Sequence, residues 1–412
     1  MANIFFGILN EDHIGNNIDK WISIAGAPDI FSERNDQIEK YQSKLLEKYD
    51  VVSIKEALKR YPNADVWITY RRVGWVPNWL AKIIPPEKIH FLEADLEYRK
   101  GCSFLGNTIL YRENSFSPCC SIGQGPVVKA SGPVHDRLTK WQDFTTELVD
   151  DIRHERPNQC QTCHMLSYGF WRKSVKLNSF TFGAKTRDDV CNFSCIYCDH
   201  AKIRERLEEA TPGNSVYEVL QQLAEIPEYN TEELSIRFGN GEFTAYKHCK
   251  DILDIFFMKT KWKMSMVSNC SIYNEQISEL MEIGRVRSLV TSIDAGTRET
   301  FKKVKQRDMF DKVLENLRKY PLSKTQFAAK YIFLDGVNDN ETDVDGFYRI
   351  VQEIGGLIML SSNKTTPYTE KVKDLVLRLI SKAKSDGIKV KADSTYVNHA
   401  DEMFIIESYA NA

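Results

Sequence analysis

Residues 191–198 read CNFSCIYC, which places Cys191, Cys195 and Cys198 in a CxxxCxxC pattern. The stretch follows an apolar run, 179–183, that is typical of a buried β-strand, so we expect it on a loop. Three thiolates can hold three irons of a 4Fe-4S cube, and with no fourth cysteine nearby one iron stays open to another ligand. A structural zinc site is the simpler alternative, but zinc sites usually close with four protein ligands in pairs. The spacing therefore favours an iron–sulfur loop.

Around this loop, strand-like and helix-like segments alternate from residue 177 to the end of the chain. Amphipathic stretches such as 216–224 and 311–319 are expected to be helices. Repeats of β then α imply a parallel sheet curled into a partial, TIM-like (β/α)6 barrel, in which the chemistry lies on the loops after the strands. The six strands are expected at 179–183, 233–238, 263–267, 288–293, 327–334 and 357–360.

The cysteine triplet, with the aromatic Tyr197 just before its last cysteine, resembles the signature loop of radical S-adenosylmethionine (SAM) enzymes. The resemblance implies that Cys191, Cys195 and Cys198 ligate a 4Fe-4S cluster, whose open iron binds the amino and carboxylate groups of SAM. In that family, an electron from the reduced cluster releases methionine and a 5'-deoxyadenosyl radical, which abstracts hydrogen from a substrate carbon. A low-potential electron donor such as flavodoxin or ferredoxin is implied as a partner.

The segment Gly239-Asn240-Gly241-Glu242 follows the second expected strand and resembles the GGE motif of the same family. That motif receives the SAM amino group through backbone carbonyls and the glutamate, so Gly239, Gly241 and Glu242 are implied as cofactor-binding residues. The segment departs from the motif by one Asn inserted between the glycines.

Two further strand ends resemble SAM-contacting segments of the family. Ser292-Ile293-Asp294 matches its SxD segment, which implies that Ser292 and Asp294 bind the SAM ribose hydroxyls; a strand end with a helix cap is the plain alternative. Lys330 precedes a turn at 335–340 where relatives cradle adenine, and it is implied as a cation for the SAM carboxylate. An ordinary strand followed by a turn rich in Asn, Asp and Gly is an equally good interpretation.

A second group of cysteines lies upstream: Cys102, the adjacent Cys119 and Cys120, and the CxxC pair Cys160 and Cys163. Four thiolates suffice for a closed 4Fe-4S cluster. Adjacent side chains point differently, so only one of Cys119 and Cys120 is expected to bind, and Cys119 is preferred. The arrangement is similar to the SPASM or twitch auxiliary modules of radical SAM enzymes, although those modules usually follow the barrel. A zinc site on the same cysteines is the alternative.

Two other features have both a functional and a plain interpretation. Cys270, after the third expected strand, is a candidate catalytic thiol that returns a hydrogen atom to a substrate radical; a small buried side chain is the commoner role of such a cysteine. Lys302, Lys303 and Lys305 form a basic run on an expected helix, which favours a solvated face.

We predict three domains: a Rossmann-like α/β domain over 1–100, the auxiliary module over 101–176, and the barrel with a C-terminal extension over 177–412. No glycine-rich phosphate loop accompanies the first domain, so a nucleotide role there is fold analogy alone. In this domain, strands are expected at 4–9, 66–70 and 89–92, and helices at 35–49 and from Ser53 onward.

The 412-residue chain is 42% hydrophobic, with 55 basic against 57 acidic side chains. It lacks the strongly basic charge of a dedicated nucleic-acid binder, so no nucleic-acid partner is expected. No run approaches the ~20 apolar residues that span a bilayer, and the start lacks a basic leader, so no membrane association is expected and a cytoplasmic location is predicted.

The function predicted is that of a radical SAM enzyme with an auxiliary cluster. Its substrate is a sugar or nucleotide-sugar, which would suit the Rossmann-like domain, or a peptide, which would suit the auxiliary module. Two other classes remain open: a non-catalytic iron–sulfur protein for electron transfer or redox sensing, and a zinc-stabilised binding protein.

Overall fold

The computed structural model divides into two compact units, an N-terminal unit (residues 1–106 and 144–176) and a sheet unit (residues 107–143 and 177–412). Residues 107–143 belong to the sheet unit, although they lie inside the segment predicted as the auxiliary module. In the part of the chain that the structure describes, no helix is long and apolar enough to cross a membrane. The described residues are 3–7, 22–27, 51–52, 58–59, 62–63, 65–68, 84–91, 96–102, 104–112, 114–119, 125–163, 166–182, 190–198, 214–363, 366–393 and 397–411.

The N-terminal unit contains a five-stranded mixed sheet with the order β3-β2-β1-β4-β5. β1, β4 and β5 are parallel and correspond to the three predicted strands, whereas β2 and β3 pair antiparallel and were not predicted. Two helices were also predicted here, one at 35–49 and one that begins at Ser53. The first helix and the start of the second lie outside the described residues. The strands are β1 (Asn3–Gly7), β2 (Ile22–Ala27), β3 (Val51–Val52), β4 (Asp65–Ile68) and β5 (Ile89–Phe91), the last preceded by the 3-10 turn η4 (Pro86–Lys88).

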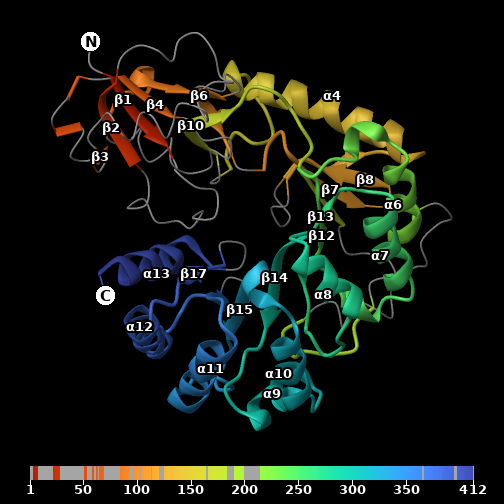
Figure 1. Ribbon diagram of the computed structural model, residues 1–412, viewed down its shortest axis with the longest axis vertical. Helices are drawn as coiled ribbons and strands as arrows, with labels where there is room; N and C mark the ends of the chain where they lie inside the picture. The colour runs from red at the N-terminus through yellow and green to blue at the C-terminus, as the bar shows by residue number, and fades with distance from the viewer. Residues whose placement is uncertain are drawn as a thin grey trace. The chain divides into compact units, whose positions relative to one another are not determined.

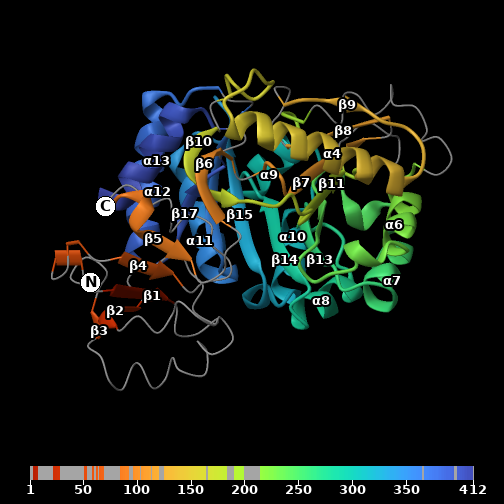
Figure 2. The same ribbon diagram turned by 90° about the horizontal axis from the view of Figure 1, so that it is seen from above.

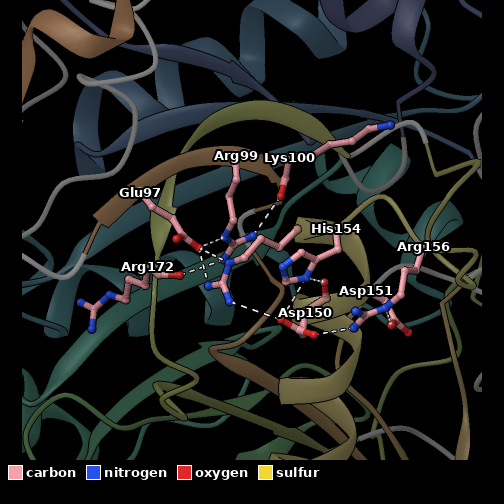
Figure 3. Close-up of polar contacts among 9 residues, drawn as sticks. Glu97, Arg99, Lys100, Asp150, Asp151, His154, Arg156 and Arg172 are labelled. Carbon is pink, nitrogen blue, oxygen red and sulfur yellow. Dashed lines mark hydrogen bonds and ion pairs between the residues drawn. The ribbon is translucent and has the colours of Figure 1, made fainter.

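The same unit holds an antiparallel pair, β6 (Leu96–Gly101) with β10 (Ser167–Arg172), and the last part of the long helix α4 (Val134–Arg153). Arg99 on β6 is 8% exposed, and its guanidinium donates to Glu97, to the carbonyl of Lys100 and to the carbonyl of Arg172. Figure 3 shows how this group continues through Asp150 and its neighbours at the end of α4. Charged hydrogen bonds thus fasten the strand pair to the helix.

The sheet unit is built on a ten-stranded sheet with the order β17-β16-β15-β14-β13-β12-β11-β7-β8-β9 (Figures 1 and 2). β11 to β17 are parallel and follow one another in chain order, the arrangement that successive βαβ units give. The six predicted strands are present within two residues at each end; curling into a partial barrel stays a prediction. They are β11 (Ser179–Phe182), β12 (Ser235–Phe238), β13 (Lys263–Val267), β14 (Val286–Ser292), β15 (Gln326–Phe333) and β16 (Leu357–Ser362).

Four strands of this sheet were not predicted. β7 pairs in parallel with β11, and β8 and β9 extend the edge as an antiparallel hairpin, so the segment before the cysteine loop contributes to the sheet itself. At the other edge β17 pairs with β16. Their bounds are β7 (Thr108–Arg112), β8 (Ser115–Ser117), β9 (Val128–Lys129) and β17 (Val390–Ala392).

The helices between the strands begin at side chains that cap them. Ser215, Asn274, Thr297, Asn340 and Thr369 each accept a hydrogen bond from the backbone N–H three residues later. Such caps satisfy donors that the first helical turn leaves unpaired. The helices are α6 (Val216–Ala224), α7 (Cys249–Met258), α8 (Glu275–Glu282), α9 (Arg298–Lys305), α10 (Phe310–Lys319), α11 (Glu341–Ile354), α12 (Glu370–Ser385) and α13 (His399–Asn411), with 3-10 turns η6 (Pro227–Tyr229), η7 (Phe243–Ala245) and η8 (Leu322–Lys324).

The two faces of the parallel sheet differ in chemistry. One face, here the helix face, is apolar and packs against helices α4, α7 and α11. Its ring contacts include Phe238 with Phe256, Tyr331 with Phe347, and the Arg137 guanidinium over Tyr111. The alternate positions form the polar face, where Arg237, Gln326 and Lys391 are exposed. Because parallel sheets covered on both faces read as continuous apolar runs, this alternation marks a face that meets solvent or a ligand.

Candidate functional site

The cysteine loop, residues 190–198, is tied to the strand ends by backbone hydrogen bonds. The N–H of Ile196 donates to the Val304 carbonyl at the end of α9 (3.0 Å), and the N–H of Glu242, after β12, donates to the Val190 carbonyl (2.6 Å). Phe193 is buried and packs edge-on against a phenylalanine of α9. The loop is therefore held at the carboxyl ends of the strands, where the sequence places it.

Asn269, after β13, is a contact of the loop that sequence analysis missed. Its side-chain amide donates to Asn192 Oδ1 (2.8 Å) and lies 3.9 Å from the Cys191 sulfur. Asn192 in turn donates to Ser271 Oγ (2.7 Å). Hydrogen bonds to ligand sulfurs tune metal centres. The available signal was its position directly after a predicted strand, next to Cys270.

The three thiols of the loop form no disulfide with any described cysteine, and they are partly buried. Burial raises the pKa of Cys191 to about 11 and also raises that of Cys195, where the nearby Lys305 ammonium acts in the opposite direction. No three His, Cys, Asp or Glu side chains within the described ranges are placed to share one metal ion. A cubane puts each thiolate on a different iron, so this donor set of three soft sulfurs fits a cluster better than a single zinc.

Glu242 is 1% exposed and fully occupied by protein donors. Its carboxylate accepts from the hydroxyl and N–H of Thr244 (2.7 and 3.2 Å), from Ser268 Oγ (2.8 Å) and from the N–H of Asn269 (2.6 Å). Burial raises its pKa, while these hydrogen bonds act to lower it. Glu242 thus joins the ends of β12 and β13, and its predicted contact with SAM stays a prediction.

The glycines before Glu242 leave room beside the backbone. Gly241 has φ +64°, a left-handed conformation that side chains disfavour. A Cβ added at Gly239 would meet no atom within 4 Å. Open space next to a strand end is compatible with the predicted approach of a ligand to this segment.

Asp294 joins three elements through its buried carboxylate. It is 0% exposed and accepts from Tyr197 OH (2.8 Å), Lys305 Nζ (2.5 Å) and the N–H of Ile332 on β15 (2.7 Å). Burial and the Asp294 charge raise the pKa of Tyr197. The expectation of a solvated basic run is therefore wrong for Lys305, which is 2% exposed because it pairs with this carboxylate.

Lys330 lies on the polar face, next to the half-buried Ser292 in the register of β14 and β15. Its ammonium lies 2.5 Å from Asp393 after β17, and Ser361 Oγ donates to the same carboxylate. Both charged side chains are largely buried. The predicted cation is thus already neutralised by a carboxylate at the neighbouring strand end.

The turn after β15 is organised by Asn338, to which sequence analysis gave no individual role. It is 0% exposed; its amide donates to the carbonyls of Asp294 and Ile332 and accepts from the N–H of Leu334. Beside this turn lies a cavity of about 290 Å³. It is lined by Ile196, Tyr197, Phe333, Leu334, Asp335, Val337, Ser362, Asn363, Thr366, Pro367, Tyr368 and Val372.

Cys270 has φ +52° and is 1% exposed. Its sulfur lies 3.0 Å from Thr291 Oγ1 on the helix face of β14, and burial raises its pKa to about 12. The enclosed thiol matches the plain interpretation, a small buried side chain, better than a donor at the mouth of the barrel. Its catalytic role stays a prediction.

The auxiliary cysteines fall into both units. Cys102 and Cys160 pack against a buried apolar cluster of the N-terminal unit, and the N–H of Cys163 donates to the Cys160 carbonyl (2.9 Å). Cys119 belongs to the sheet unit, at the end of the β7–β8 hairpin. The adjacent Cys120 lies outside the described residues.

Comparison with known proteins identifies the central part of the sheet unit. Residues 189–349 match the family model of the Radical SAM superfamily. An uncharacterized protein of Methanocaldococcus jannaschii is 27% identical over 161 residues, which are 37% of this chain and 47% of that protein, so the chain spans about half of this relative's length. The prediction is confirmed to this extent: the chain carries a radical SAM domain, which supports an enzyme.

Solved structures are similar to this chain at low sequence identity and with TM-scores below 0.5. A radical SAM methyltransferase from Sphaerobacter thermophilus is 15% identical, with 49% of this chain and 63% of that chain covered and a TM-score of 0.35. SuiB of Streptococcus suis, bound to S-adenosylmethionine, is 11% identical, with 53% and 50% covered and a TM-score of 0.38. The assignment of a radical SAM domain therefore rests on the family model and not on these structural similarities.

Proposed function

Because residues 189–349 form a radical SAM domain, we propose that this chain is a radical SAM enzyme that binds a 4Fe-4S cluster on Cys191, Cys195 and Cys198. The observation that carries the proposal is the single anchored loop on which the three thiols lie, beside a cavity of about 290 Å³. When bound, the cluster and SAM supply the electron and the 5'-deoxyadenosyl radical that takes a hydrogen atom from a substrate carbon.

The residues around the loop have the chemistry to position SAM. The cavity, with Phe333 and Tyr368 in its wall, offers apolar surface and backbone groups for the adenosyl part. Ser292 offers a hydroxyl on the polar face, and the open backbone at Gly239 leaves space for the amino acid part. Lys330 remains the cation proposed for the SAM carboxylate. To bind it, the ammonium would give up part of its ion pair with Asp393.

Glu242 and Asp294 are proposed to act mainly by orienting the site. Each carboxylate is buried and joins two or more strand ends, so each holds the cysteine loop in one geometry. Preorganised loops of this kind keep reacting groups aligned and exclude water from a reactive intermediate. Direct contact of either carboxylate with SAM is part of the same proposal.

The second cluster, the substrate class, the electron donor and the cellular location are further parts of this proposal. Cys102, Cys119, Cys160 and Cys163 are proposed as ligands of a second, SPASM- or twitch-like 4Fe-4S cluster, with zinc as the alternative metal; four soft thiolates suit either. The partners proposed are a sugar, nucleotide-sugar or peptide substrate and a flavodoxin or ferredoxin donor, in the cytoplasm.

One anaerobic experiment tests the core proposal. The chain is reconstituted with iron and sulfide, mixed with dithionite and SAM, and assayed for 5'-deoxyadenosine. Replacement of Cys191, Cys195 or Cys198 by Ala is expected to abolish the product, whereas Cys249→Ser, on the buried side of α7, retains it. Unchanged cleavage in Cys198→Ala would overturn the site assignment.

Metal analysis of the same preparation separates the alternatives. Iron near eight per chain supports two cubes, and iron near four supports the loop cluster alone. Iron without any SAM cleavage is the result that a non-catalytic iron–sulfur protein would give. A colourless, zinc-containing preparation is expected of a zinc-stabilised binding protein.

A further inference from the structure

Within the part of the chain that the structure describes, three buried hydrogen-bonding atoms on the polar face have no hydrogen-bond partner. They are Arg112 Nη1 on β7, and Ser179 Oγ and Thr181 Oγ1 on β11. Buried donors left unpaired cost roughly 1–3 kcal/mol each, so native proteins rarely keep them without a reason. Their grouping on two adjacent strands points to a ligand that accepts hydrogen bonds.

The strand register places a second guanidinium beside them. Thr181 pairs with Arg237 of β12 on one side and with Leu110 of β7 on the other, and Arg112 follows Leu110 by two residues. Paired residues of parallel strands share a face, and neighbouring strands lie about 4.8 Å apart. Arg112, Thr181 and Arg237 therefore project from the same face of three adjacent strands.

Arg237 is exposed, and no hydrogen bond or ion pair joins its guanidinium to any described residue. It lies five residues before Glu242, whose N–H is bonded to the start of the cysteine loop. The cationic group is thus on the strand that supports the loop, toward its carboxyl end. In (β/α) sheets this is the end where substrates bind.

The polar face of the sheet carries mainly positive charge. Among the described strand positions of this face, the basic side chains outnumber the acidic ones, and the nearby Asp393 is paired with Lys330. An anion is attracted to such a surface. The basic residues at these positions are Arg112, Arg237, Lys263, Lys330 and Lys391.

We propose that the substrate carries a phosphate or diphosphate group, which binds Arg112, Ser179, Thr181 and Arg237 on the polar face. Two guanidinium forks and two hydroxyls offer more donors than the two oxygens of one carboxylate can accept, whereas a diphosphate has enough oxygens for all. This inference rests on the proposed function and selects the nucleotide-sugar class over a peptide.

The test is titration calorimetry of the anaerobically reconstituted full chain with inorganic pyrophosphate. The wild-type chain is expected to bind, and Arg237→Gln and Arg112→Gln are expected to weaken binding by about tenfold or more, because each removes a charge-assisted hydrogen bond. Arg237 is exposed, so this variant does not depend on repacking. The matched control is Arg318→Gln on α10, where the arginine pairs with Glu353 away from this face, and its affinity is expected to equal that of the wild type.

Succinate, titrated in parallel, distinguishes the two oxyanion chemistries and is expected to bind more weakly than pyrophosphate. The inference is overturned by no binding of pyrophosphate, by equal affinity in Arg237→Gln, or by succinate binding as tightly. Failure of the proposed function has a different signature: no 5'-deoxyadenosine from the wild type, with Arg237-dependent pyrophosphate binding intact.

Discussion

Lys305 Nζ lies 2.5 Å from Asp294 Oδ2, and neither side chain is more than 2% exposed. The pair joins the last turn of α9 to the end of β14, and Tyr197 of the cysteine loop donates to the same carboxylate. A buried carboxylate with a cation and two further donors is satisfied, but removal of the cation leaves an uncompensated charge. The pair therefore contributes to the stability of the sheet unit and, through Tyr197, to the geometry of the cysteine loop.

Replacing Lys305 with Met is expected to lower the free energy of unfolding by about 3–5 kcal/mol, because Asp294 is then a buried charge without its cation. Urea denaturation followed by circular dichroism measures the change. Lys303→Met, on the exposed side of the same helix, is the control and is expected to change stability by less than about 0.5 kcal/mol. Equal stability of the two variants would contradict a structural role for the pair.

Asp345 provides a pH-dependent contribution to stability. Hydrogen bonds from Arg378, together with Lys382, hold the pKa of Asp345 well below its usual range. A lowered folded-state pKa stabilises the protein above the unfolded pKa, near 4, and the contribution is lost as the pH falls below that value.

The urea midpoint of Asp345→Asn is therefore expected below that of the wild type at pH 7, with the gap narrowing progressively as the pH falls from about 4 toward 2. Asp374→Asn, an exposed change on α12, is the control and is expected to leave the midpoint unchanged at both ends of this range. A gap that persists undiminished at low pH would show that the destabilisation does not come from ionisation.

Asn269→Ala tests the hydrogen bond toward the Cys191 sulfur. On the proposed function, loss of this donor is expected to lower the reduction potential of the loop cluster, since donors to sulfur favour the more negative, reduced state. The shift is expected to be on the order of tens of millivolts, where 59 mV is a tenfold change for one electron. Redox titration monitored by electron paramagnetic resonance measures it, with Asn230→Ala near η6 as control. An unchanged potential would remove Asn269 from the site.

Gly296 and Gly346 meet backbone to backbone where the end of β14 touches α11. A Cβ at Gly296 would lie 2.1 Å from the Asp343 carbonyl and 2.7 Å from Gly346 Cα. Gly296→Ala is expected to destabilise the protein by about 1–3 kcal/mol or more, since backbone must move to admit the methyl group. Thermal unfolding measures it, and Gly239→Ala, with open space around its Cβ, is expected to unfold like the wild type. Similar melting of both variants would contradict the close contact.

Local sequence patterns were sufficient for six strands of the parallel sheet and for the position of the cysteine loop. β13 and α6 have the predicted bounds, because an apolar run or a 3.6-residue periodicity reports which side of an element is buried. The CxxxCxxC spacing needed no folded structure either, since three thiols within eight residues already share one loop. The match of residues 189–349 to the Radical SAM superfamily confirms the radical SAM domain, and the three cluster ligands stay a proposal.

Features that depend on contacts between distant parts of the chain could not be predicted from local sequence patterns. The burial of Lys305, the role of Asn269 and the grouping of Arg112 with Arg237 each require knowledge of which segments lie side by side. β7 precedes β11 by about 70 residues, and their parallel pairing sets which side chains share the polar face. Strand register is a long-range property, because a shift of one residue would turn Arg237 toward the helices and away from Thr181 and Arg112.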